Sequence, residues 1–174
     1  MAATIQLHVW TDAAAGTDGG SATSFSFLNI DSALDTEAAR ISNPITIPTT
    51  ACAYSYEKWI SACVTAVPAN NVSNFQMWGT PPAQAYPTGT CWMVGTAASA
   101  AGSTPVNTDM AAVKSPSNLA LATSGAKYAW DAASYAAAGC STRYLVMQLH
   151  ITTTPTAGCW VANGCVLNYS YDEV

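Results

Sequence analysis

Charged residues are scarce in this sequence. Only 9% of its 174 residues are Asp, Glu, Lys or Arg, whereas an average soluble domain has about 25%. A monomeric protein normally relies on surface charge for solubility. We therefore expect much of this surface to lie against other protein, within a large assembly.

Basic residues are also too few and too scattered for nucleic-acid binding. The chain has five Lys and Arg against ten Asp and Glu, which gives a formal net charge of −5. Binding to a phosphate backbone requires several basic side chains on one surface. The sequence therefore predicts no direct nucleic-acid partner. The five basic residues stand singly at Arg40, Lys58, Lys114, Lys127 and Arg143.

Long apolar runs are missing as well. No stretch approaches the roughly 18 apolar residues that a membrane-spanning helix needs. Residues 1–12 pass directly into an alternating pattern, without the basic and apolar segments of a secretory signal. The sequence thus predicts no membrane partner, and synthesis in the cytoplasm.

Groups suited to catalysis are rare. The sequence has no GxSxG and no Walker loop, and a triad or metal site would have to use His8 or His150. Both histidines occupy polar positions of predicted strands, where a solitary His is more often exposed or hydrogen-bonded than a ligand. A small hydrolase would need one of them beside two carboxylates. We predict no catalytic, cofactor-binding or metal-binding residues and no cofactor.

The acidic residues do not suggest glycosidase chemistry, which needs two carboxylates across a cleft. Glu57 is the one acid inside a predicted strand, and its neighbour Lys58 should point to the opposite face. A further acidic cluster lacks the alternating oxygen ligands and tight glycine turn of a calcium loop. We interpret it as solvated loop charge. It consists of Asp31, Asp35 and Glu37.

The six cysteines show no CxxC spacing, so a zinc site or a thioredoxin-like motif lacks its signature. An even number permits disulfides, but cytoplasmic synthesis favours thiols. We expect small buried hydrophobic residues, while disulfides formed late in an oxidising medium remain open. The cysteines are Cys52, Cys63, Cys91, Cys140, Cys159 and Cys165.

Alternating apolar residues, rich in β-branched and aromatic types, predict strands along the whole chain. The predicted strands are 4–10, 24–30, 53–66, 72–78, 90–96, 142–153 and 158–171, with a hairpin turn at Asn163-Gly164. Gly, Pro and small residues predict loops at 16–21, 43–48, 80–89 and 98–105. Short helices are expected at 31–40, capped by Asp31 or Ser32, and at 127–139.

This pattern predicts an all-β fold, a β-sandwich of jelly-roll type. It would have about eight antiparallel strands, long loops and one or two short helical connections. No composition shift divides the chain, so residues 1–174 should form a single domain. The six tryptophans are spread one per element and should mostly pack in the core, with one or two available for a subunit interface.

Five phrases, taken in order, resemble the capsid decoration (cement) proteins of tailed bacteriophages. They are YEKWI at 56–60, VSNFQMW at 72–78, TPVNTD at 104–109, YLVMQL at 144–149 and LNYSYDE at 167–173. The resemblance implies a β-sandwich that binds the major capsid protein lattice on the outer surface of the head and stabilises it. It also implies a virion protein without catalytic residues, a trimer or dimer at a symmetry axis, made in the host cytoplasm.

Two alternatives stay open. One is a tail or head-fibre subunit with the same fold. The other is a carbohydrate-binding module for host attachment, because Trp and Tyr stack on sugar rings. A sugar-binding module would show a coplanar row of exposed aromatic side chains on one sheet face.

Overall fold

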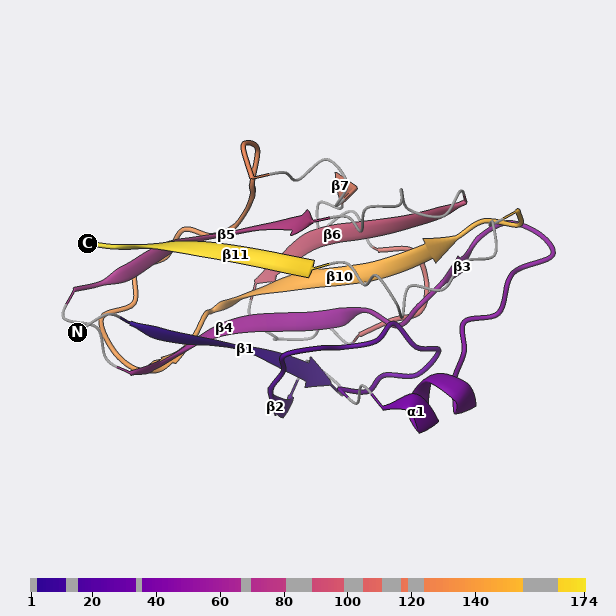
Figure 1. Ribbon diagram of the computed structural model, residues 1–174, viewed down its shortest axis with the longest axis horizontal. Helices are drawn as coiled ribbons and strands as arrows, with labels where there is room; N and C mark the ends of the chain where they lie inside the picture. Colours follow the sequence, from indigo (N-terminus) through magenta and orange to yellow (C-terminus); the bar gives the residue numbers. More distant parts are fainter. Residues whose placement is uncertain are drawn as a thin grey trace.

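The computed structural model describes residues 3–11, 16–33, 36–66, 70–80, 89–98, 105–110, 117–118, 124–154 and 166–174. Within these residues the chain forms eleven strands and one helix (Figure 1). The strands are β1 (Thr4–Thr11), β2 (Thr17–Ser21), β3 (Ala53–Tyr54), β4 (Lys58–Ala66), β5 (Val72–Thr80), β6 (Thr90–Ala98), β7 (Ser117–Asn118), β8 (Tyr128–Asp131), β9 (Gly139–Cys140), β10 (Arg143–Ile151) and β11 (Val166–Glu173). The helix is α1 (Glu37–Ser42).

The strands form two antiparallel sheets. The large sheet has eight strands in the order β2-β1-β4-β10-β6-β7, with β3 pairing with β10 and β9 pairing with β4. The small sheet has the order β11-β5-β8. Three of the eleven strands have only two residues, so eight longer strands remain. The predicted all-β sandwich is confirmed.

The main core lies between the two sheets. Alternate residues of the large sheet, such as Ile60, Leu145 and Met147, are fully buried there. They meet Phe75 and Met77 of the small sheet in the same cluster. These residues recur every second position along their strands, which is the spacing that places side chains on one face of a sheet.

The other face of the large sheet is buried too, so this sheet has two covered faces. Trp59, Tyr144 and Val146 form a second apolar cluster there with Met110 from the segment 105–110. Both parities of β4 are therefore buried along most of its length. We call this second side the outer face of the large sheet.

Two segments differ from the sequence prediction, because backbone pairing decides whether a segment is a strand. Residues 24–30 form no strand, although Phe25 and Phe27 pack against the core. The backbone of this region makes only isolated hydrogen bonds to other segments. For example, the Tyr56 N–H donates to the Leu28 carbonyl. Residues 16–21, predicted as a loop, instead contain β2. Gly19 allows the pairing, since a Cβ there would lie 2.7 Å from the Val9 carbonyl oxygen.

The helix predictions were partly wrong. Residues 127–139 form β8 and β9 in place of a helix, because burial of alternating aromatic residues outweighs the helix propensity of the alanines. Trp130 is buried and Tyr135 bridges to Val72. In the 31–40 region the helix begins later than predicted, and its N-cap is Thr36, whose hydroxyl accepts from the Ala39 N–H at 3.1 Å.

The expectation of free thiols was wrong for one pair of cysteines. Cys63 of β4 and Cys140 of β9 face each other in the ladder and form a disulfide. Cys52 and Cys91 are free, as expected, but Cys52 is exposed and Cys91 only partly buried, so the expectation that they would be buried was wrong. The predicted Asn163-Gly164 turn lies outside the described residues, as do Lys114, Cys159, Trp160 and Cys165.

Candidate functional site

The first candidate is an exposed segment, residues 41–52, which we call the arm; its first two residues, Ile41 and Ser42, are the end of α1, and the rest has no strand or helix. Figure 1 shows it running on from the last turn of α1, at the end of the molecule opposite both termini. Ile41 is 71% exposed and Ile47 is 55% exposed. Pro44 and Pro48 lack N–H donors and favour extended backbone. Among the described residues, positions 44–51 form no hydrogen bond with the sandwich.

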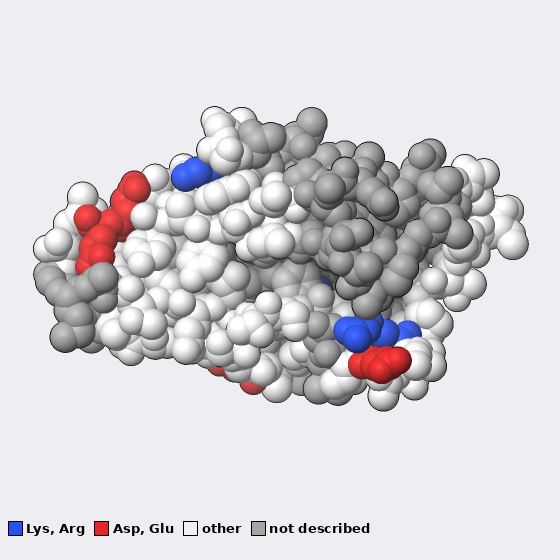
Figure 2. All heavy atoms as spheres, in the orientation of Figure 1, with Lys and Arg blue, Asp and Glu red and all other residues white. Residues whose placement is uncertain are grey.

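The arm contains no charged side chain. On the face shown in Figure 2, acidic and basic groups occur as a few small patches on an otherwise neutral described surface. Ile41 and Ile47 expose apolar surface on a segment without charge, and this surface can be removed from water only by contact with another molecule. The arm is therefore a candidate binding surface for protein.

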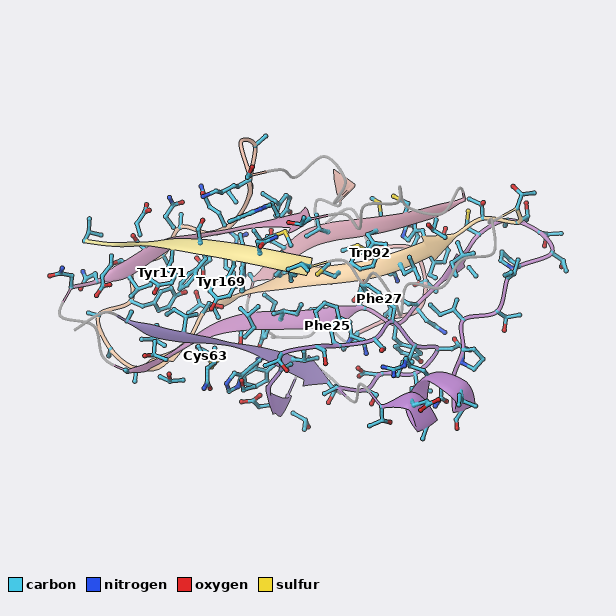
Figure 3. All side chains as sticks on the ribbon, viewed as in Figure 1. Phe25, Phe27, Cys63, Trp92, Tyr169 and Tyr171 are labelled. Carbon is cyan, nitrogen blue, oxygen red and sulfur yellow. A yellow bond between two sulfur atoms is a disulfide. The ribbon has the colours of Figure 1, made fainter. Side chains whose placement is uncertain are left out.

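The second candidate is a cavity of about 740 Å³ between the sheets. Its aromatic wall comes from Phe25, Phe27 and Trp92, which Figure 3 shows gathered together. The Phe27 and Trp92 rings are 5.2 Å apart between centroids. The remaining lining is mostly apolar, with hydroxyls from Thr23, Ser24 and Ser26 and the guanidinium of Arg40. This arrangement suits an apolar group that carries a few polar atoms.

The small sheet does not present a row of aromatic rings on the part of its outer surface that is described. Tyr169 and Tyr171 point inward, and their hydroxyls donate to the Ile5 and Ala3 carbonyls, each at 3.3 Å. Trp78 lies on the outward parity of β5, and the Lys127 ammonium covers its ring at 4.9 Å. The surface pattern expected of a planar sugar-binding face is thus missing from the described residues.

Glu57, the acid predicted inside a strand, lies just before β4 and is fully buried. Its carboxylate accepts from the Trp59 indole N–H at 2.8 Å and from the Val106 backbone N–H at 3.4 Å. Gln148, also fully buried, donates to the carbonyls of Ser55 and Thr108 at 2.9 and 2.8 Å. The two side chains attach the segment 105–110 to the outer face. Their role is structural.

The two histidines lie in different parts of the large sheet. His8 of β1 is opposite Ser61 of β4. His150 lies on β10, five residues beyond Leu145, which is the residue opposite Ile60 of β4. At about 3.3 Å per residue this separates the histidines by more than one metal ion can bridge. They do not form a site with each other.

Hydrogen bonds hold His150 in place. Its Nε2 lies 3.1 Å from the Gln148 side-chain oxygen and 3.6 Å from an Asp109 carboxylate oxygen. Burial lowers the pKa of His150, and the negative charge of Asp109 partly opposes this effect. The sulfur atoms of Cys91 and Met93 lie nearby along β6, on the same face.

His8 instead belongs to a third candidate, a cluster with Cys63 and Cys140. One ring nitrogen of His8 and the two sulfur atoms all lie within 4.8 Å of one another. The Asp18 carboxylate contacts His8 Nδ1 at 2.9 Å. Figure 3 places Cys63 in the half of the molecule away from Phe27 and Trp92, so the cluster and the cavity are separate.

The sequence did not reveal this cluster, because its members are far apart in the chain and match no motif. One signal was present: His8 and Cys63 occupy the parity opposite to the core residues of their strands.

The acidic group 31–37 forms no site among the described residues, since Glu37 is exposed in the first turn of α1. Asp35 lies outside the described residues, and Asp31 is partly buried.

The chain matches no protein-family model, no curated protein and no solved structure. No described helix has the length and apolar character needed to cross a membrane.

Proposed function

We propose that the protein is a structural subunit of a phage virion, a decoration protein that binds the outer surface of the capsid lattice and stabilises it. The supporting observation is the uncharged arm, whose exposed isoleucines lie outside the protein's own core. The resemblance of its strand phrases to decoration proteins supports the same function.

The arm offers moderate binding energy per copy. Fully burying an exposed isoleucine side chain contributes about 1.5–3 kcal/mol, and Ile41 and Ile47, which are 71% and 55% exposed, can each contribute the corresponding share of that amount. A dimer or trimer at a symmetry axis would engage several arms at once, and such multivalent contact raises the effective affinity without new kinds of contact. Binding through uncharged residues should also depend little on salt.

The proposal is tested by adding the purified protein to undecorated heads. Wild-type protein should saturate them stoichiometrically and raise their disruption temperature. The Ile41→Asp/Ile47→Asp double variant should bind at least about 100-fold more weakly, because both side chains lose their burial at the interface. Val174→Asp is the matched control, since Val174 is similarly exposed but lies at the other end of the molecule, and it should bind like wild type.

Two outcomes would contradict the proposal. Wild-type protein that does not bind heads rules out decoration, and a double variant that binds normally rules out the arm as the contact. Copy number in the particle separates decoration from a tail or fibre role, because a shell protein is present in hundreds of copies.

A carbohydrate-binding role is the second candidate, and the cavity favours it. Phe25, Phe27 and Trp92 line it, together with Ser24 and Ser26. This alternative would be supported if the wild-type protein does not bind capsids but binds a defined glycan, and if the Trp92→Ala variant does not bind that glycan.

A further inference from the structure

The cluster of His8, Cys63 and Cys140 is built on three adjacent strands of the large sheet. Cys63 of β4 is opposite Cys140 of β9 on one side and Gln6 of β1 on the other. His8 is two residues from Gln6, on the same face of β1. The ladder therefore fixes the backbone positions of the three residues, whatever the state of the sulfur atoms.

His8 is held in one orientation by Asp18. Both carboxylate oxygens lie close to Nδ1, at 2.9 and 3.0 Å, and the Gly20 N–H donates to Asp18 at 2.7 Å. With the proton on Nδ1, the lone pair of His8 is on Nε2. A carboxylate behind the imidazole is the usual second partner of a metal-binding histidine, because it fixes the tautomer and increases the basicity of the ligand.

The Nε2 atom of His8 is buried and has no hydrogen-bond partner among the described residues. Buried polar atoms in folded proteins are nearly always hydrogen-bonded, so such an atom requires an explanation. A ligand that accepts the lone pair would satisfy it. Two sulfur atoms lie within 4.8 Å of a ring nitrogen of His8, and as thiolates they bind the same metal ions as imidazole.

The spacing fits a tetrahedral zinc ion. With Zn–S near 2.3 Å and Zn–N near 2.05 Å, the sulfur atoms would be about 3.8 Å apart and each about 3.5 Å from the nitrogen. The nitrogen–sulfur separations are compatible with the 4.8 Å limit on the three ligand atoms, whereas the two sulfur atoms are bonded to each other and must move apart to the zinc-site distance once the disulfide is reduced. Cys140 is partly exposed on a two-residue strand, next to Gly139 with φ of 146°, so its side chain has room to move away from Cys63.

We propose that His8, Cys63 and Cys140 form a redox-gated site for a thiophilic metal ion of the zinc class. In the oxidised protein the disulfide closes the site. Reduction by a dithiol delivers two electrons and two protons, which yields two cysteine thiols while the reductant becomes a disulfide. Zinc then binds both sulfurs and Nε2, the two thiol protons pass to solvent, and water fills the fourth position.

The site would give β4 and β9 a cross-link in either environment. In a reducing compartment the metal ion would join the strands, and in an oxidising medium the disulfide does so. This inference does not depend on the proposed binding to capsids, and it is tested on the isolated protein alone.

The test titrates cobalt(II), as a spectroscopic probe, and zinc(II) into the full chain before and after reduction with a phosphine. Reduction of the disulfide consumes one phosphine and one water and gives the phosphine oxide. Reduced protein should bind one cobalt ion with the absorption bands of a tetrahedral thiolate site, and excess zinc should displace it. Oxidised protein should show no such bands.

Variants separate this site from other thiols. His8→Gln keeps both cysteines and should remove the tetrahedral bands, while Asp18→Asn should weaken zinc binding by about 10–100-fold. His150→Gln and Cys91→Ser are the matched controls and should bind like wild type, since neither residue is in the cluster. Thermal melting of the oxidised variants checks that each one folds.

The inference is overturned if reduced wild-type protein binds no cobalt or zinc. It is equally overturned if a folded His8→Gln variant binds both ions as wild type does, because the metal would then lie elsewhere.

Discussion

The two faces of the large sheet are both buried, but by different means. The inner face meets the small sheet through apolar side chains such as Leu145, Met147 and Phe75. The outer face combines an apolar cluster around Trp59 with buried polar groups, among them Gln148. Apolar burial is non-directional, whereas buried polar groups require partners at defined positions.

The difference shows how each face is specified. The inner face needs only a second surface of suitable shape, which the small sheet supplies. The outer face needs the backbone of residues 105–110 in one position, where its carbonyls and N–H groups satisfy Glu57 and Gln148. Stability should therefore respond to volume on the inner face and to hydrogen bonding on the outer face.

The largest effect is expected from Leu145→Ala on the inner face. Leu145 is fully buried, and such truncations lower the free energy of unfolding by about 2–5 kcal/mol through lost burial and the cavity left behind. Leu167→Ala, at a partly exposed position of β11, should cost less. Denaturant unfolding measures both variants. Equal losses would mean that the inner face is not the principal core.

A smaller effect is expected from Gln148→Met on the outer face. Methionine has a similar size but cannot donate to Ser55 and Thr108, and leaving buried carbonyls unpaired costs about 1–3 kcal/mol. The same change at Gln76, on the solvent side of the small sheet, should alter stability by about 0.5 kcal/mol or less. Equal unfolding energies for wild type and Gln148→Met would show that the polar contacts contribute nothing.

The smallest effect should be a pH dependence from His150. Burial lowers its folded pKa below the ordinary value of 6.5, so the unfolded chain binds the proton more readily. Its contribution to stability is complete above that value and is lost as the pH falls through the folded pKa. His150→Gln should flatten the profile of unfolding free energy in this range. Asp109→Asn should extend the loss to lower pH, since the opposing charge is removed.

Sequence patterns predicted most long strands, and the reason is visible in the packing. The stretches 4–10, 72–78, 90–96 and 142–153 became β1, β5, β6 and β10 because their apolar residues alternate and one parity enters the core. The same alternation failed for residues 24–30, where side chains enter the core but the backbone has no continuous partner. Alternation of apolar and polar residues therefore predicts which side chains are buried, but it does not predict whether the backbone pairs with another strand.

The candidate sites could not be predicted from the sequence to the same extent as the strands. Neither His8 nor Cys63 stands in a motif, and the thiol prediction for Cys63 and Cys140 rested on compartment alone. Part of the arm was predicted as a loop at 43–48, but the exposure of Ile41 and Ile47 could not be predicted from their residue type. Exposure depends on which surfaces the rest of the fold leaves uncovered.

The sequence by itself determined that the chain builds paired β-sheets with few charges, because period-two hydrophobicity and composition are local properties. Only the tertiary structure decided that the large sheet is covered on both faces and that Cys140 meets Cys63 beside His8. These contacts join positions up to 132 residues apart, and their geometry follows from strand order and register, which no local pattern encodes.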